Sequence, residues 1–104
     1  MKKQYNKLIR DKIPDVISAG GGTSTTRELS SEEYIAALDE KLNEELAEYQ
    51  CDKNIEELAD LIEVIYAVTK ARGYSLEELE RVRKKKVDER GSFDKRLFLL
   101  EVDS

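Results

Sequence analysis

Four acidic residues near the middle of the chain have types and spacings that suit metal binding. Glu45 and Glu48 are three residues apart, and Glu57 and Asp60 repeat this spacing a short distance further on. Residues three apart on a helix project from the same side, so each pair presents two carboxylates together. Four carboxylates that converge in a partly buried volume repel one another strongly. We therefore expect a divalent cation to neutralise them.

The amino-acid composition limits which metal ion these acids can bind and which reactions the chain can catalyse. The chain has no histidine and a single cysteine, which excludes His-ligated zinc and nucleophiles activated by an imidazole. Oxygen-only ligation suits Mg²⁺, or alternatively Mn²⁺. Mg²⁺ held by carboxylates keeps positions open for phosphate oxygens, which indicates phosphoryl or pyrophosphate chemistry.

Charge is distributed unevenly along the 104 residues. Residues 28–63 carry 13 acidic residues and only Lys41 and Lys53 as cations, a net charge of −11, whereas the whole chain has −5. We expect these two lysines to be too few and too peripheral to neutralise the acidic quartet. The overall negative sign disfavours nucleic acid as a partner.

Helix-capping signals define the elements that must position these acids. Ser30 with Glu33, Asn54 with Glu57, and Ser75 with Glu78 each have the spacing of a capping box. The sequence predicts an all-α fold, a helical bundle that forms one domain over residues 1–104. Its predicted elements are a central antiparallel helix hairpin (31–50 and 54–72), a third long helix (76–90), a short N-terminal helix within 5–19, and a minor two-stranded β element that pairs 23–28 with 97–102.

The hairpin explains how the two acidic pairs would meet. Its connection is only four or five residues long, so Glu48 and Glu57 should face each other about one turn from it, with Glu45 facing Asp60 one turn deeper. On a helical wheel Glu45 falls inside the apolar arc around Leu38, a position that packing alone would give to leucine. Glu57 has a second role available to it, the completion of its own capping box.

The helix expected at 54–72 is apolar almost all round. Such a helix is normally buried on more than one side, so we expect a homodimer or homotetramer built around it. No apolar run reaches the length of about 18–20 residues needed to span a bilayer, and we expect neither a signal peptide nor a membrane partner. The lone Cys51 suits a reducing, cytoplasmic location.

The acidic motifs resemble those of a known superfamily. The sequence EELAE at 44–48 followed by ELAD at 57–60 is similar to the EExxE…ExxD signature of the all-α nucleoside triphosphate pyrophosphatases. These include MazG, the dimeric dUTPases and phosphoribosyl-ATP pyrophosphohydrolase. The opening YNKLIRDKIP at 5–14 and the closing motif from Arg83 to Phe93 resemble a small MazG-like subgroup. The connection between the two acidic pairs is shorter than in MazG and the dUTPases, so a substrate class does not follow.

The resemblance implies Mg²⁺-dependent cleavage of the anhydride between the α- and β-phosphates of a nucleotide, giving a monophosphate and pyrophosphate. The matching metal ligands are Glu45, Glu48, Glu57 and Asp60. Glu44 also matches, but its wheel position faces away from the others. For the catalytic base we select Glu48, because no imidazole is present to take the proton.

Cations are also needed to stabilise the charge on the leaving pyrophosphate. The candidates for substrate binding are Arg10, Lys12, Arg83, Lys86 and Arg90. Arg10 has an alternative role, an ion pair with Asp11, with Asp15 or with an acid on another helix. Two rival functions remain open: a non-catalytic module that binds metal or nucleotide, and a helical oligomerisation module without a metal.

Overall fold

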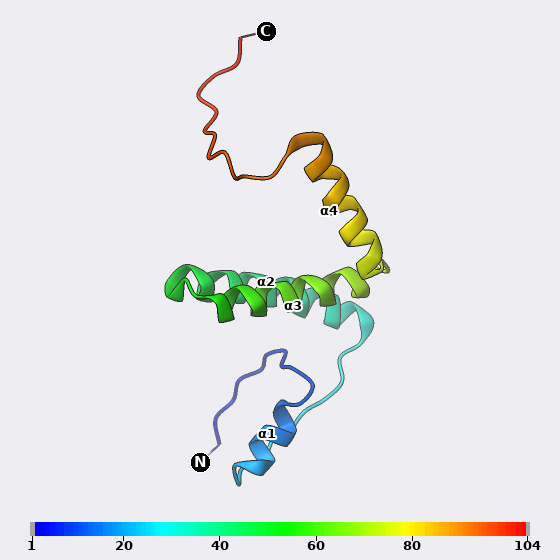
Figure 1. The fold of residues 1–104 in the computed structure, drawn as a ribbon. Coiled ribbons are helices and arrows are strands. Elements are labelled where there is room, and N and C mark those ends of the chain that lie inside the picture. Colours follow the sequence, from blue (N-terminus) through cyan, green and yellow to red (C-terminus); the bar gives the residue numbers. More distant parts are fainter. Residues whose placement is uncertain (1, 104) are drawn as a thin grey trace.

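Within the described residues, four helices make up the regular structure of the chain (Figure 1). The computed structural model describes residues 2–103, and within them no strand is present, so the all-α prediction is confirmed for this part. None of these helices combines the length and the apolar content that crossing a bilayer requires. The helices are α1 (Ile13–Ala19), α2 (Ser31–Asp52), α3 (Ile55–Ala71) and α4 (Leu76–Arg90).

Side-chain caps fix where the long helices begin. The Ser30 hydroxyl accepts a hydrogen bond from the Glu33 amide at 3.2 Å, and the Glu33 carboxylate accepts one from the Ser30 amide at 3.0 Å. Ser75 caps α4 in the same reciprocal way. At α3 the Asn54 side chain accepts from the Glu57 amide at 3.0 Å, but the reciprocal bond from the Asn54 amide is not formed. The expected capping box is therefore half made, and the Glu57 carboxylate is left for other contacts.

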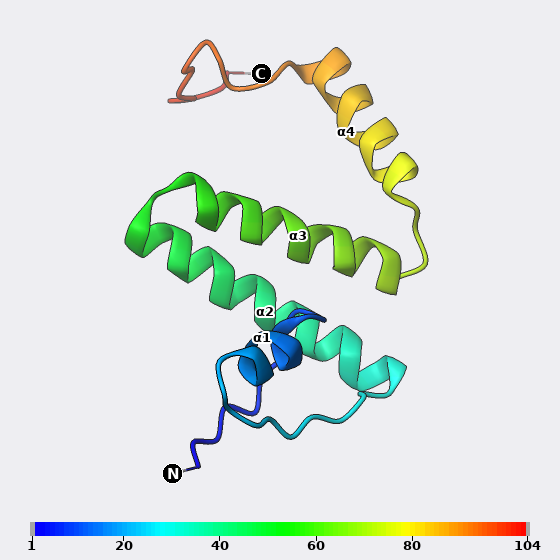
Figure 2. The same ribbon diagram turned by 60° about the horizontal axis from the view of Figure 1, so that its bottom comes forward.

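Helices α2 and α3 lie side by side and run in opposite directions (Figures 1 and 2). Only Lys53 and Asn54 separate them, and Lys53 makes the reversal with a left-handed backbone, φ 53°. The two buried apolar side chains of the described residues, Leu38 on α2 and Val64 on α3, come one from each helix. The small core of the chain is thus the seam between α2 and α3.

The rest of the chain extends away from this pair. Helix α4 contacts the pair through α3 and then departs, and the segment after it projects beyond the helices (Figure 1). The radius of gyration is 18.4 Å, whereas a compact chain of this length has about 13 Å. The described residues therefore form an open arrangement of helices.

The predicted two-stranded β element is absent from residues 2–103. Residues 23–28 and 97–102 both lack regular structure, and they lie on opposite sides of the α2–α3 pair (Figure 1). A strand needs an adjacent strand to pair its backbone groups, and these segments are too far apart to supply one. The apolar run at 97–102 was a wrong indicator of a strand for this reason.

Candidate metal centre

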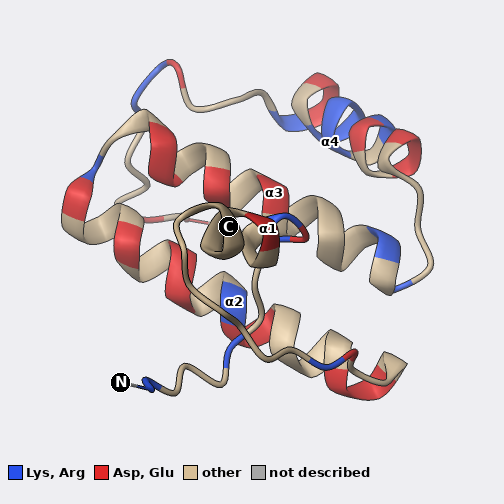
Figure 3. Cartoon of the chain, turned by 90° about the horizontal axis from the view of Figure 1, so that it is seen from below, with Lys and Arg blue, Asp and Glu red and all other residues tan. Residues whose placement is uncertain are grey.

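Helices α2 and α3 bring acidic side chains together near the end of their contact that adjoins the link at Lys53 and Asn54. Glu45 from α2 and Glu57 and Asp60 from α3 each offer a carboxylate oxygen, and these oxygens lie within 4.8 Å of one another. Glu45 also belongs to a second group with Glu44 and Glu48, which has the same maximum separation. We call these five residues the acidic cluster. Figure 3 shows acidic positions along α2 and α3 with few basic positions among them, whereas α4 carries both kinds.

Glu45 is the most deeply placed member of the acidic cluster. The residue is only 7% exposed, because it occupies the apolar arc of α2 that faces α3. Its Oε1 atom lies 3.5 Å from the Lys41 ammonium, but its Oε2 atom is buried and has no hydrogen-bond partner. Leaving a buried acceptor unsatisfied costs about 1–3 kcal/mol, so this oxygen is placed for a ligand that the protein itself does not supply.

A second orphaned oxygen comes from the other helix. The Oε2 atom of Glu57 is also buried without a hydrogen-bond partner. Glu57 and Glu45 thus contribute one unsatisfied carboxylate oxygen each, from opposite sides of the α2–α3 seam. Oxygen ligands of this kind fit a hard divalent cation such as Mg²⁺ or Mn²⁺.

The pKa values of Glu45 and Glu57 are both raised above those of ordinary glutamates. Burial raises the pKa of Glu45, and the nearby charges of Glu48 and Asp60 add to this, against the opposing effect of Lys41. Burial likewise raises the pKa of Glu57, and Glu48 and Asp60 again reinforce the shift. The acidic cluster therefore holds more negative charge than its surroundings stabilise.

Two cations from the N-terminal segment partly offset this charge. An Arg10 guanidinium nitrogen donates to the Asp60 carboxylate at 2.6 Å, and the Lys7 ammonium lies 3.5 Å from Glu44. For Arg10 the structure thus shows the alternative considered above, an ion pair with an acid on another helix. Residues 7–10 therefore pass over the acidic cluster, from Glu44 on α2 to Asp60 on α3.

Lys41 corrects the prediction that the lysines of the acidic stretch are peripheral. Its side chain is only 17% exposed and lies 3.3 Å from Glu44 and 3.5 Å from Glu45. A carboxylate oxygen of Glu44, which the helical wheel placed away from the other acids, lies within 4.8 Å of those of Glu45 and Glu48 on its own helix. A sequence signal for Lys41 was present, since acids three and four residues later on a helix are its natural partners. Nothing local indicates the Lys7 contact.

Glu48 lies at the solvent side of the acidic cluster. It is exposed, yet its charge acts on both Glu45 and Glu57. Glu48 therefore lies beside the two buried acids and remains open to solvent.

The other predicted substrate-binding cations are not brought to the acidic cluster within this chain. Arg83 is engaged with Glu80 on its own helix, with an Nε to Oε2 distance of 2.9 Å. Lys86 and Arg90 are exposed on α4, which departs from the α2–α3 pair. Lys12 is exposed at the start of α1.

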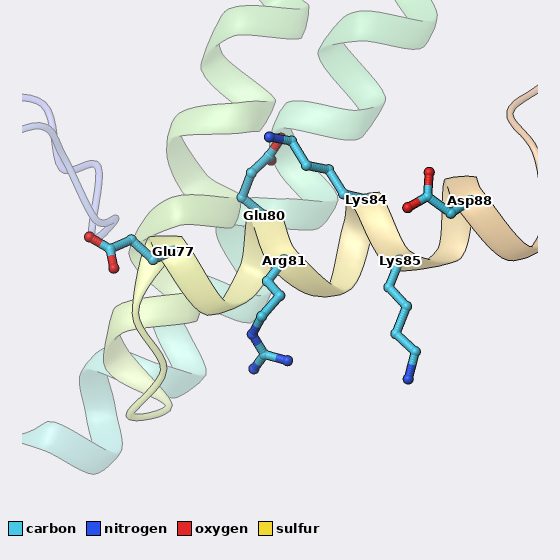
Figure 4. Close-up of a pocket in the computed structure, with 6 residues that line it drawn as sticks. All are labelled: Glu77, Glu80, Arg81, Lys84, Lys85 and Asp88. Atoms are coloured by element: carbon cyan, nitrogen blue, oxygen red, sulfur yellow. The ribbon is translucent and has the colours of Figure 1, made fainter.

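A hollow on the surface of α4 lies outside the acidic cluster. Its lining residues all come from one helix, with Arg81 and Lys85 pointing to one side of it (Figure 4). It therefore lacks the second wall that encloses a ligand, and the acidic cluster remains the better candidate. The lining residues are Glu77, Glu80, Arg81, Lys84, Lys85 and Asp88.

The chain has sequence similarity to another protein over part of its length. The chain is 57% identical over 42 residues to an uncharacterized protein of Mycolicibacterium smegmatis. This match covers 40% of the chain and 43% of that relative, so the similarity spans less than half of either protein. No protein-family model and no solved structure matches the chain.

Proposed function

We propose that this protein is a Mg²⁺-dependent nucleotide pyrophosphohydrolase. Its substrate would be a nucleoside triphosphate, standard or modified, or a related phosphoribosyl nucleotide, and its products a monophosphate and pyrophosphate. The observation that carries the proposal is the pair of buried carboxylate oxygens, Glu45 Oε2 and Glu57 Oε2, that have no hydrogen-bond partner. The resemblance of the 44–60 region to the EExxE…ExxD signature supports the same reaction.

The metal would be held by Glu45, Glu48, Glu57 and Asp60. When bound, it would neutralise phosphate charge and lower the pKa of a coordinated water. Because Glu48 is exposed at the edge of the acidic cluster, it can accept a proton from an attacking water and return it to solvent. Burial and the ion pair with Lys41 hold the Glu45 side chain in place, with its carboxylate directed toward α3.

Arg10 has two positions open to it in this mechanism. In the structure it neutralises Asp60. If Asp60 held a cation, the guanidinium would be free beside the site, where it could donate to two phosphate oxygens in the bidentate manner that suits arginine. Lys12 would add another positive charge to the same N-terminal segment. Arg83, Lys86 and Arg90 lie on α4, away from the acidic cluster of their own chain, so they would contact the phosphates only from another chain.

A second candidate function is supported by the internal ion pairs. Lys7, Arg10 and Lys41 already neutralise part of the acidic cluster, so a protein that binds metal or nucleotide without turnover, or only oligomerises, is compatible with the same geometry. Binding of Mn²⁺ without any pyrophosphate release would favour the binding module. Absence of Mn²⁺ binding would favour the oligomerisation module.

The test is pyrophosphate release from a panel of nucleoside triphosphates in the presence of Mg²⁺. We expect Glu45→Gln and Asp60→Asn to abolish release. Glu40→Gln is the matched control, because Glu40 is exposed on the same helix as Glu45 but outside the acidic cluster, and it should retain full activity. Release of single phosphates, or activity that persists in a chelator, would overturn the proposal.

A further inference from the structure

Lys41 is held in the acidic cluster more firmly than the other cations that contact it. It is the only basic residue of α2 (Figure 3). Its ammonium lies 3.3 Å from both carboxylate oxygens of Glu44 and 3.5 Å from Glu45 Oε1. The Lys41 side chain is largely covered, whereas those of Lys7 and Arg10 are 45% and 58% exposed. Because exposed ion pairs contribute little stability, Lys7 and Arg10 are displaced from the cluster more readily than Lys41.

The acidic cluster consists of two overlapping groups. We call Glu44, Glu45 and Glu48 the α2 group, and Glu45, Glu57 and Asp60 the seam group. Glu45 belongs to both groups, with Oε1 beside Lys41 and Oε2 buried without a hydrogen-bond partner. Both of the orphaned oxygens, on Glu45 and Glu57, belong to the seam group. The seam group therefore needs a cation from outside the chain, and the α2 group already has one from within it.

The formal charges of the acidic cluster lead to the same division. Its five carboxylates carry five negative charges, and three side-chain cations lie at ion-pair distance from them: Lys7, Arg10 and Lys41. Two negative charges remain, which is the charge that one divalent cation neutralises. A second divalent cation would give the cluster a net positive charge in a partly buried volume, where like charges repel strongly.

We infer that the Lys41 ammonium takes the place of a second divalent cation, so that the acidic cluster binds a single metal ion, at the seam group. This inference rests on the metal centre of the proposed function. Glu48 remains available to the same ion as a further ligand, because its carboxylate lies close enough to Glu57 to act on it. Lys41 is thus a positioning residue that fixes the number of metal ions.

The substitution of an ammonium for a metal ion has a chemical consequence. Sites with two metal ions, about 3.5–4 Å apart, stabilise both the attacking and the leaving oxygen. An ammonium only donates hydrogen bonds, so Lys41 supplies charge but no coordination position for water or phosphate. Stabilisation of the leaving pyrophosphate would therefore depend on side-chain cations, of which Arg10 lies against the seam group.

The test is the number of Mn²⁺ ions that each full-length chain binds without nucleotide, measured by calorimetric titration and by electron paramagnetic resonance. We expect one ion for the wild type. Lys41→Met removes the ammonium and keeps a similar side-chain length and helix propensity, so we expect this variant to bind two. Its two neighbouring ions should couple magnetically and broaden the spectrum that an isolated Mn²⁺ ion gives.

Two controls separate the position of Lys41 from the loss of a positive charge. Lys70→Met removes the same charge from an exposed site in the last turn of α3, about 15 Å along the helix from Asp60, and should still bind one ion. Adding Glu44→Gln to Lys41→Met removes an acid together with the lysine and should return the count from two ions to one. If Lys41→Met does not fold, Lys41→Gln replaces it, with the same expected count.

The outcomes distinguish this inference from the proposed function. Two ions bound by the wild type, or one ion bound by a well-folded Lys41 variant, would overturn the inference and leave pyrophosphate release unaffected. Two ions bound by Lys70→Met would also overturn it, because the position of the lysine would then not matter. A wild type that binds no Mn²⁺ would overturn the metal centre and the inference together.

Discussion

Replacing Glu45 with glutamine is expected to have opposite effects on stability with and without metal. Without metal, the substitution removes a buried negative charge whose Oε2 atom has no partner and keeps the side-chain volume nearly the same. With metal, the same substitution removes a proposed ligand. The two effects can be separated by measuring thermal unfolding of both proteins at one protein concentration, in chelator and in Mg²⁺ or Mn²⁺.

The magnitude without metal follows from the contacts of Glu45. The amide that replaces the Glu45 carboxylate can donate to the neighbouring carboxylates of Glu57 and Asp60, and a hydrogen bond to a charged group is worth about 1.5–3 kcal/mol. Loss of the ion pair with Lys41 offsets part of this gain. That loss is limited, because Lys41 keeps Glu44 at 3.3 Å. A net gain of about 1 kcal/mol corresponds to a melting temperature about 4–8 °C higher for a domain of this size.

The magnitude with metal follows from ligand linkage. A cation present at 100 times its dissociation constant stabilises the native wild type by about 2.7 kcal/mol, which is about 10–20 °C in melting temperature. If loss of Glu45 weakens binding by about 100-fold, the variant gains only about 0.4 kcal/mol. The wild type is then the more stable protein in metal, and the variant the more stable one in chelator.

The control is again Glu40→Gln, which should change stability by less than about 0.5 kcal/mol in either condition. A Glu45→Gln protein that is less stable than wild type in chelator would show that the Lys41 pair outweighs the buried charge. A wild type whose melting temperature is indifferent to both cations would refute the metal centre itself.

Three further predictions follow from the same contacts. The metal-free protein should lose stability as the pH rises above about 4.5, because Glu45 and Glu57 have raised pKa values and hold protons that the unfolded chain has already released. Urea unfolding at pH 5 and at pH 7.5 measures this loss, and equal stability at the two pH values would contradict the prediction. Arg10→Ala should tighten Mn²⁺ binding by about 1.5–5-fold, since an exposed ion pair of about 0.2–1 kcal/mol no longer competes for Asp60; calorimetric titration measures it, and weaker binding would show that Arg10 supports the site. Leu38→Ala should lower the free energy of unfolding by about 2–5 kcal/mol, because this side chain is only 3% exposed; a loss below about 1 kcal/mol in chemical denaturation would mean that the α2–α3 seam is not the core.

The helices were predictable because their start signals are local. The side chains of Ser30 and Ser75 each bond the amide three residues later, so the sequence alone located both starts. The ends were less accurate: α2 continues to Asp52 rather than 50, because Lys53 supplies a left-handed turn that is usually made by glycine. The β element was wrong because pairing depends on distant segments, which no local pattern records.

Some features of the acidic cluster follow from local sequence patterns, and others depend on distant parts of the chain. The helical periodicity around Glu45 indicated a polar group on a packed face, and the structure places its side chain there. The contacts of Lys7 and Arg10 depend on how the N-terminal segment crosses α2 and α3, over separations of 37 and 50 residues. Sequence spacing offers no means of predicting such contacts.

The two-residue link between α2 and α3 restricts where this chain can change in length. One residue added at the start of α3 would turn every later side chain by about 100° about the helix axis. Asp60 would then turn away from Glu45 and the buried Val64 would turn away from α2, so a single insertion would disturb both the acidic cluster and the core. Related sequences should therefore vary in length within residues 20–29 and 91–103. The link should keep a constant length, because it sets the rotation of α3 about its axis relative to α2.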